Sequence, residues 1–354
     1  MNPTVDTIII GGGQSALACA YYLRRSSLDF LVLDDQPEAG GSWRRCWDSL
    51  TLFSPAEFSS LPGWLMPKSK GKYPSRLEVT SYLKQYEQRY KLPVRRPVNH
   101  HSVCRKGQLF EVQTDEATYY ARTVISATGT FQKPYIPHYP GQETFQGLSL
   151  HSSAYQYPQP FTGKRVLIVG GGNSGAQVLA EVSKVAQTTW VTLEAPSYLP
   201  DDVDGRVLFD QASARYYAMQ KGGQPDPAQY NLGNIVMVPS VLEARERGVL
   251  KAVPPFEKFY EHGVVWQEGT KEAVDAIVWC TGFGYALAHL ECLQVVNEKG
   301  QVATEGTRAL EQPGLWLIGY GGWTGFASAT LIGVGRTARE TARQVENFIS
   351  AEFK

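Results

Sequence analysis

Residues 164–175 read KRVLIVGGGNSG, a hydrophobic run that breaks into Gly170-x-Gly172-x-x-Gly175. This G-x-G-x-x-G pattern predicts a dinucleotide-binding turn between a strand and a helix. The first glycine permits the tight turn, the second lets the backbone approach a pyrophosphate, and the third lets the helix pack closely on the strand. The pyrophosphate would lie on unpaired N–H groups at the helix N-terminus, beside Asn173 and Ser174.

A second turn of the same kind lies near the N-terminus, and two such turns are far more specific than one. A strand at residues 7–10 leads into a glycine-rich turn, a helix over residues 16–25 and a second strand at residues 30–33, which ends in Asp34. Asp34 follows the turn by about 20 residues, where an acid accepts hydrogen bonds from a ribose. The residues of this turn predicted to bind the dinucleotide are Gly11, Gly13, Gln14, Ser15 and Ala16, where Ala16 replaces the third glycine.

Length, charge and cysteine content limit the class of protein. The 354 residues predict two domains, and the 43% hydrophobic content indicates a sizeable core. Formal net charge is zero without a basic block, which disfavours a nucleic-acid partner. The sequence contains no long apolar run and no signal-like start, so we expect no membrane insertion and a cytoplasmic location. Five cysteines without a C-x-x-C pair favour reduced thiols and disfavour a zinc site.

Periodicity predicts the elements between and after the two turns. Residues 77–90 have helical spacing, and residues 98–103, 109–114 and 118–127 resemble strands of an antiparallel meander. Residues 197–234 form a polar insertion with a helix over residues 207–220. We interpret it as a solvated excursion, with a lid over a nicotinamide as the alternative.

The end of the chain repeats the features of its start. Strands at residues 189–193, 263–267 and 274–279 follow the second turn, and a strand at residues 315–318 precedes a helix over residues 327–348. Two strands end alike, in Ala127-Thr128-Gly129 and in Cys280-Thr281-Gly282. Aromatic residues are dense in the loop over residues 40–64, where core packing and a wall beside a flat ligand are equally good explanations.

The segment before the second turn identifies a family. Phe145, Gly147, His151 and Tyr155 match F-x-G-x-x-x-H-x-x-x-[YF], the identifying sequence of flavin-containing and Baeyer–Villiger-type monooxygenases. The whole chain resembles the short bacterial flavin-containing monooxygenases. The resemblance implies an α/β fold with two Rossmann-like domains. Residues 1–157 and 285–354 would bind FAD, and residues 158–284 would bind NADH or NADPH.

The resemblance also implies which residues bind the cofactors and what they do. The N-terminus of the last helix, near residues 327–331, would supply a counter-charge to the flavin N1 edge. His151 and Tyr155 would form a hinge between the domains, with a buried, hydrogen-bonded core histidine as the alternative. Besides the turn residues above and Asp34, the resemblance assigns cofactor binding to Gly41, Ser42, Trp43, Val98, Ala127, Thr128, Gly129, Glu194, Thr281, Gly282, Gly319 and Ala329.

Two departures from the family bear on its chemistry. The family usually places an asparagine beside the flavin, but residues 51–60 contain none, and Phe53 or a neighbouring residue takes its place. The second strand of the nicotinamide domain is followed by Glu194 rather than by basic residues, which favours NADH at least as much as NADPH.

The implied reaction is carried by the cofactor. A hydride passes to FAD, oxygen adds at the flavin C4a position, and one oxygen atom passes to a sulfide, an amine or a ketone. The partners are therefore a small-molecule substrate and O2, and a homodimer stays open. An NAD(P)H oxidase or flavin reductase without oxygenated product, and a nucleotide-sensing partner of a transport or resistance system, are the alternatives.

Overall fold

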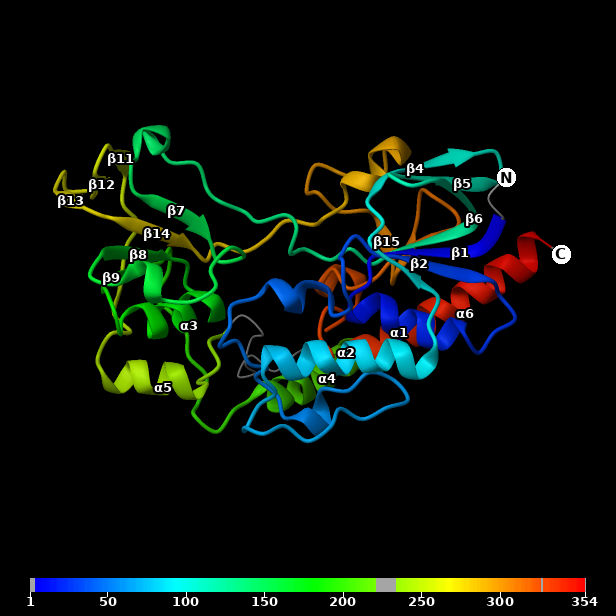
Figure 1. Cartoon of the computed structure of the whole chain (residues 1–354), viewed down its shortest axis with the longest axis horizontal. Coiled ribbons are helices and arrows are strands. Elements are labelled where there is room, and N and C mark those ends of the chain that lie inside the picture. The colour runs from blue at the N-terminus through cyan, green and yellow to red at the C-terminus, as the bar shows by residue number, and fades with distance from the viewer. Residues whose placement is uncertain (1–3, 221–233, 326, 354) are drawn as a thin grey trace. The chain divides into compact units, whose positions relative to one another are not determined.

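The computed structural model describes residues 4–220, 234–325 and 327–353, which form two compact units (Figure 1). Unit 1 comprises Met1–Arg44, Ser54–Lys133 and Gly284–Lys354, and unit 2 comprises Arg45–Phe53 and Pro134–Phe283. The sequence placed residues 134–157 in the first domain, but here they belong to unit 2. The cause is strand pairing, because β7 (Leu148–His151) pairs in parallel with β14 (Ala276–Trp279).

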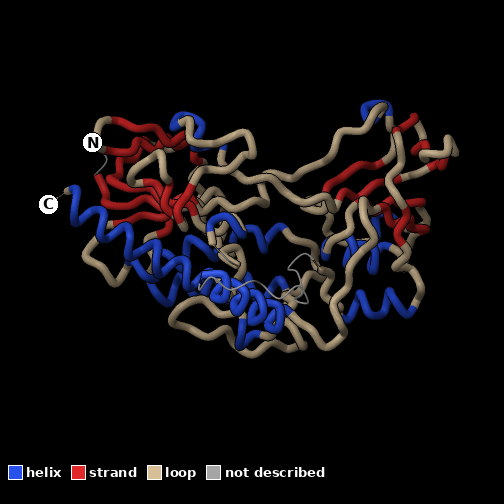
Figure 2. Tube along the Cα trace, turned by 180° about the vertical axis from the view of Figure 1, so that it is seen from behind, coloured by secondary structure: helices blue, strands red, loops and turns tan. Residues whose placement is uncertain are grey.

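Unit 1 is built on a nine-stranded sheet (Figures 1 and 2). The hydrophobic strand β1 lies at its centre, in parallel register with β2 and β6 on either side. Its strands are β1 (Thr4–Ile10), β2 (Phe30–Leu33), β3 (Val94–Arg95), β4 (His100–Lys106), β5 (Leu109–Thr114), β6 (Thr118–Ser126), β15 (Thr304–Glu305), β16 (Arg308–Ala309) and β17 (Leu315–Leu317).

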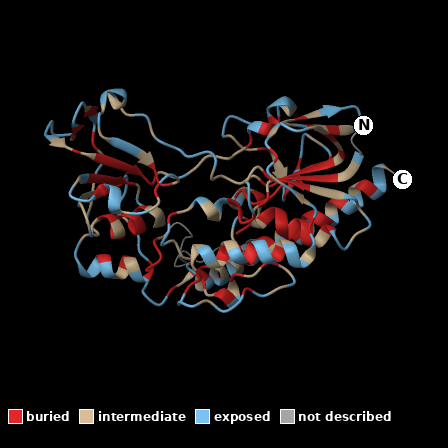
Figure 3. Cartoon of the chain, viewed as in Figure 1, coloured by how far each residue is buried: buried red, intermediate tan, exposed pale blue. Residues whose placement is uncertain are grey.

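Three long helices accompany this sheet. They are α1 (Gln14–Leu23), α2 (Arg76–Tyr90) and α6 (Val334–Glu352). Helices α1 and α6 pack against each other, and α1 is buried along most of its length (Figure 3). A capping box between Ser75 and Glu78 starts α2, which confirms the helix predicted from residue 77. The predicted meander is confirmed as β4, β5 and β6.

Unit 2 repeats the parallel plan on a smaller scale. Its five-stranded sheet has the order β10-β9-β8-β14-β7, and a separate three-stranded sheet has the order β11-β12-β13. The additional strands are β8 (Arg165–Val169), β9 (Gln187–Val191), β10 (Ala252–Val253), β11 (Lys258–Tyr260), β12 (Gly263–Val265) and β13 (Lys271–Ala273). The helices are α3 (Asn173–Val182), α4 (Gly205–Gln220) and α5 (Pro239–Glu246).

The insertion and the last helix differ from their predictions. Helix α4 confirms the helix predicted within the insertion, and residues 221–233 lie outside the described residues. The described part of the insertion is not wholly solvated, because Leu199 and Leu208 are buried. The last helix begins at Val334, not at residue 327, and Ala327 itself has a left-handed backbone, outside the α-helical region.

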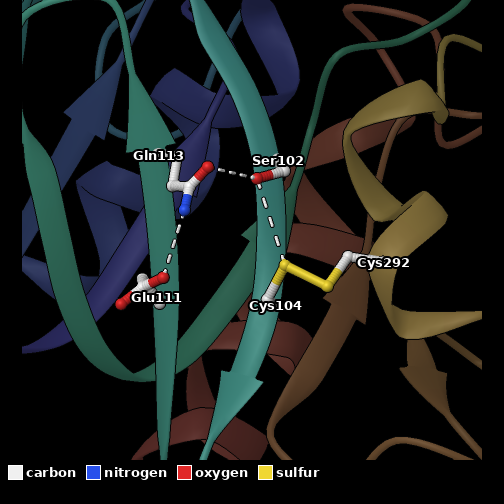
Figure 4. The surroundings of a disulfide bond; sticks show 5 residues. All are labelled: Ser102, Cys104, Glu111, Gln113 and Cys292. Carbon is white, nitrogen blue, oxygen red and sulfur yellow. Dashed lines mark hydrogen bonds between the residues drawn. A yellow bond between two sulfur atoms is a disulfide. The ribbon is translucent and has the colours of Figure 1, made fainter.

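The pairing of the cysteines also differs from the expectation. Cys104 on β4 forms a disulfide with Cys292 on the short helix η5 (Ala288–Leu293), as Figure 4 shows. The expectation of reduced thiols is therefore wrong for this pair. The two residues are 188 positions apart, and only the fold brings their Cα atoms to 5.3 Å. Cys19, Cys46 and Cys280 form no disulfide. Within the described ranges, no helix combines the length and the apolar character needed to span a bilayer.

Candidate dinucleotide-binding sites

The first glycine turn is closed by the strand that runs beside it. Gly11 has a φ of +104°, and a Cβ at this position would lie 2.6 Å from the carbonyl oxygen of Ala127. Gly13 is the N-cap of α1, and a Cβ there would meet no atom within 4 Å. The turn therefore needs a glycine where it meets Ala127, and it is open at Gly13, where a pyrophosphate must approach.

Side chains from three distant segments meet at the start of α1. The Gln14 amide donates to the carbonyl oxygen of Ala329 at 2.5 Å and accepts from the Trp43 indole N–H at 2.8 Å. The structure thus brings together three residues predicted to bind FAD. Two more are in contact, since a Cβ at Gly319 would overlap the Ser15 hydroxyl. Ser42 is exposed and Gly41 lies against the Gly13 backbone.

Asp34 lies over this turn, almost fully buried at 2% exposure. Its carboxylate would overlap a Cβ on Gly12, so it lies directly on the turn backbone. It accepts a hydrogen bond from Arg96 Nε at 2.9 Å and one from the Gln36 N–H. Burial raises the pKa of Asp34, and the Arg96 charge opposes that shift. Val98, which is also buried, donates its N–H to the Asp34 carbonyl.

A buried polar network holds the Thr128 turn. The Tyr320 hydroxyl contacts Thr128 Oγ1 at 2.7 Å, accepts from the Thr128 N–H and contacts Ser126 Oγ. Ser126 Oγ also lies 2.9 Å from His289 Nε2. Burial lowers the pKa of His289 to about 3, so it stays neutral. The sequence analysis missed Arg96, Tyr320 and His289, because no motif spacing points to residues that act through the fold.

The second glycine turn reproduces the first. A Cβ at Gly170, where φ is +131°, would overlap the carbonyl of Cys280, as Gly11 meets Ala127. Gly172 is the N-cap of α3, and a Cβ there also meets nothing within 4 Å. A Cβ at Gly175 would overlap the Gly170 carbonyl, so the helix packs on the strand as predicted. Gly129 and Gly282, the last residues of the two repeated endings, both have positive φ.

Asn173, at the first turn of α3, is engaged with the insertion. Its side-chain amide donates to the Asn234 carbonyl at 3.1 Å and accepts from the Val236 N–H at 2.8 Å. Ser174, the next residue, is half-buried. In the second T-G ending, the Thr281 hydroxyl donates to the Tyr135 carbonyl. The Asn173 side chain is therefore used to fix the end of the insertion beside the turn.

Glu194 differs from Asp34 in its position after the strand and in its exposure. Strand β9 ends at Val191, three residues before Glu194, whereas the prediction continued it to residue 193. Thr192 then donates its N–H to the Val253 carbonyl, and Glu194 is exposed. Leu193 is 88% exposed, so it adds nothing to the core.

The four signature residues have structural roles within unit 2. A Cβ at Gly147 would overlap the Phe145 ring, so the glycine makes room for that ring. His151 is buried and donates from Nε2 to the Gly282 carbonyl at 3.0 Å, while its Nδ1 accepts from the Ser153 N–H. The Tyr155 hydroxyl donates to Glu181 on α3 at 2.8 Å. His151 thus holds the second T-G turn as a neutral, hydrogen-bonded core residue.

Phe53, which we predicted at the place of the family asparagine, contacts the insertion. Its side chain is 38% exposed, and its carbonyl accepts from the Gly205 N–H at 2.6 Å. A Cβ at Gly205 would overlap the Phe53 ring, so the ring rests on the start of α4.

The expected counter-charge to the flavin from a helix N-terminus at residues 327–331 is wrong, because those residues precede α6.

Comparison with known proteins places these features in a family. The model of the pyridine nucleotide-disulphide oxidoreductases matches residues 8–204. A solved flavin-containing monooxygenase from Stenotrophomonas maltophilia is 52% identical, with a TM-score of 0.90 over 98% of this chain and 99% of that one. The chain belongs to the flavin-containing monooxygenases. It is therefore an enzyme, an oxidoreductase of Rossmann-type fold that uses FAD and a nicotinamide dinucleotide.

More distant relatives span nearly the same length. An uncharacterized oxidoreductase, CzcO, from Bacillus velezensis is 30% identical over 96% of this chain and 99% of its own. Indole-3-pyruvate monooxygenase YUCCA1 from Oryza sativa is 26% identical over 96% and 90%. Enzyme status leaves the nucleotide-sensing alternative without support.

Proposed function

We propose that this flavin-dependent monooxygenase uses NADH or NADPH and O2 to oxygenate soft heteroatoms, above all sulfides, or ketones. The observation that carries the proposal is the pair of open glycine turns. Gly13 and Gly172 each cap a helix and leave room for a close ligand, so one chain can hold two dinucleotides.

We assign FAD to the turn of unit 1. Bound FAD supplies hydride acceptance and oxygen activation, and the chain supplies binding and orientation. The N–H groups at the start of α1 would hold the pyrophosphate, and Asp34 would accept from a ribose hydroxyl. Gln14, Trp43 and Ala329 are already held together by hydrogen bonds, which gives this end of the site a fixed geometry.

We assign the nicotinamide dinucleotide to the turn of unit 2, beside α3. Glu194 follows the strand where an adenosine ribose 2′ position is expected. An exposed carboxylate can accept from a 2′-hydroxyl but repels a 2′-phosphate, which supports use of NADH. Because Glu194 is exposed, solvent and salt screen this repulsion, and NADPH stays a substrate.

The test is aerobic turnover with NADH and a panel of aryl sulfides and ketones, with sulfoxide or ester, hydrogen peroxide and consumed NADH all quantified. Oxygenated product in a substantial ratio to consumed NADH is the expected result. NADH consumption matched by peroxide alone, for every substrate of the panel, would contradict the proposal.

That contrary outcome is the second candidate function, an NADH oxidase. One observation favours it: residues 51–60 contain no asparagine, and the exposed face of Phe53 offers no hydrogen bond. An apolar ring can exclude water but cannot stabilise a polar oxygen adduct, so the oxidase reaction competes with oxygenation.

A further inference from the structure

Arg96 joins two carboxylates beneath the first glycine turn. Its Nε donates to Asp34 Oδ2 at 2.9 Å, and its Nη1 donates to both oxygens of Glu87 on α2, at 2.7 and 2.8 Å. The three side chains are 12%, 2% and 16% exposed, so water screens this triad poorly. Arg96 thereby fixes the orientation of Asp34, the acid that lies against the turn.

One nitrogen of the Arg96 guanidinium group, Nη2, is not used by these two carboxylates. Among the described residues, Arg96 Nη2 has no hydrogen-bond partner, although the atom is buried. A buried N–H donor without an acceptor destabilises the folded protein, and more so where the group is charged. A site that retains such a donor next to a ribose-binding acid is suited to a ligand that brings its own acceptor.

We propose that Arg96 is a positioning residue for the adenosine half of FAD. It holds Asp34 in the ionised, correctly turned state, and its free Nη2 donates to the bound cofactor. This inference rests on the assignment of FAD to unit 1. It concerns cofactor affinity, not oxygenation, so it stands or falls separately from the choice of substrate.

The charges around Asp34 give the proposal a pH signature. Arg96 faces Asp34 directly, Asp35 is the adjacent acid, and Glu87 reaches it through the shared guanidinium. Burial raises the pKa of Asp34, Asp35 raises it further, and Arg96 lowers it. Without the guanidinium the pKa of Asp34 must rise, so the carboxylate becomes protonated at a higher pH. Loss of the ionised acceptor then weakens FAD binding as pH falls.

The experiment titrates apoprotein with FAD and follows flavin fluorescence between about pH 5 and 8. Arg96→Met should raise the Kd for FAD at least about tenfold at pH 8, and further toward pH 5. Arg96→Lys keeps the positive charge but loses the free donor, so its Kd should rise with a pH profile like that of the unaltered protein. The matched control is Arg95→Met, because the Arg95 side chain is exposed and donates to the Tyr119 hydroxyl, and Arg95 meets Asp34 only through its backbone carbonyl, which the substitution keeps.

The variants separate positioning from a general loss of structure. In an Asp34→Asn background the pH dependence should vanish, and Arg96→Met should not restore it. A folded Arg96→Met protein with unaltered Kd at both ends of the pH range would overturn the proposal. If Arg96→Met does not fold, Arg96→Lys decides, since an unaltered Kd there has the same meaning. Gly13→Glu tests the FAD assignment itself, because retained FAD in that variant would show that the cofactor binds elsewhere.

Discussion

The two dinucleotide turns of this chain share a backbone but differ in the acid that follows each. Gly11 and Gly170 meet the carbonyls of Ala127 and Cys280 in the same way, and Gly13 and Gly172 are equally open. Asp34, however, is buried and paired with Arg96, whereas Glu194 is exposed. The backbone geometry of the two turns is thus the same, while the surroundings of the acid differ.

The largest expected effects come from variants that block one of the two turns at a time. Gly13→Glu should abolish FAD binding, because a carboxylate would occupy the place of the pyrophosphate and repel it. A Cβ at Gly13 meets no atom, and its φ of −80° suits any residue, so the variant should fold. Flavin absorbance of the purified protein is the measurement.

Gly172→Glu is the matched control, because its surroundings are equally open. It should retain FAD and lose reduction by NADH, measured by anaerobic bleaching of the flavin. A Gly172→Glu protein that loses FAD and is still reduced by NADH after FAD is added back would reverse the two assignments.

The sequence was sufficient for the features that this comparison rests on. Short-range patterns predict the two turns, the helix α2 and the strands β4 to β6, since glycine spacing and hydrophobic periodicity reflect local geometry. The repeated T-G endings also have a physical counterpart, as Ala127 and Cys280 each close a glycine turn.

The features that the sequence missed all depend on distant segments meeting. Cys104 and Cys292 are far apart in the chain, so their disulfide leaves no local pattern. Arg96 is one of two adjacent arginines, and only the fold shows which of them reaches Asp34. The start of α6 was placed too early because apolar spacing continues through residues 327–333, where Ala327 adopts a left-handed backbone.

The disulfide makes the comparison sharper, because it lies in unit 1 and the described residues of unit 2 contain no counterpart. Cys104→Ser should lower the free energy of unfolding of unit 1 by about 2–4 kcal/mol, because the bridge restricts a long loop of the unfolded chain. Urea unfolding followed by flavin release measures it.

Two controls belong to this experiment. Cys46→Ser removes a thiol that forms no disulfide, so this variant should keep the sensitivity of the unaltered protein to a reductant. A reductant should lower the stability of the unaltered protein but not of Cys104→Ser. Equal sensitivity of both proteins to the reductant would show that the bridge contributes nothing to unit 1.

A smaller effect tests the acid of the second turn. Glu194→Arg should change the ratio of kcat/KM for NADPH over NADH by about tenfold in favour of NADPH, since an exposed arginine gains a screened attraction to the 2′-phosphate. Glu194→Gln, which removes only the charge, should give an intermediate ratio. An unchanged ratio in both variants would place the 2′ position away from Glu194.

The smallest expected effect concerns Phe53. Phe53→Asn should raise the fraction of NADH oxidation that yields oxygenated product by a factor of about two to five. The asparagine amide can form a hydrogen bond to a buried polar group, and the phenyl ring cannot. Leaving such a group without a hydrogen bond costs on the order of 1–3 kcal/mol. Because the Phe53 ring rests on Gly205, the shorter side chain also loosens this contact, which limits the gain.

Phe53→Leu is the control, because leucine is apolar and cannot form the hydrogen bond. Product and hydrogen peroxide should be counted together for a single aryl sulfide. Equal coupling in the asparagine and leucine variants would mean that polarity at this position does not govern the fate of oxygen, and that packing against α4 does.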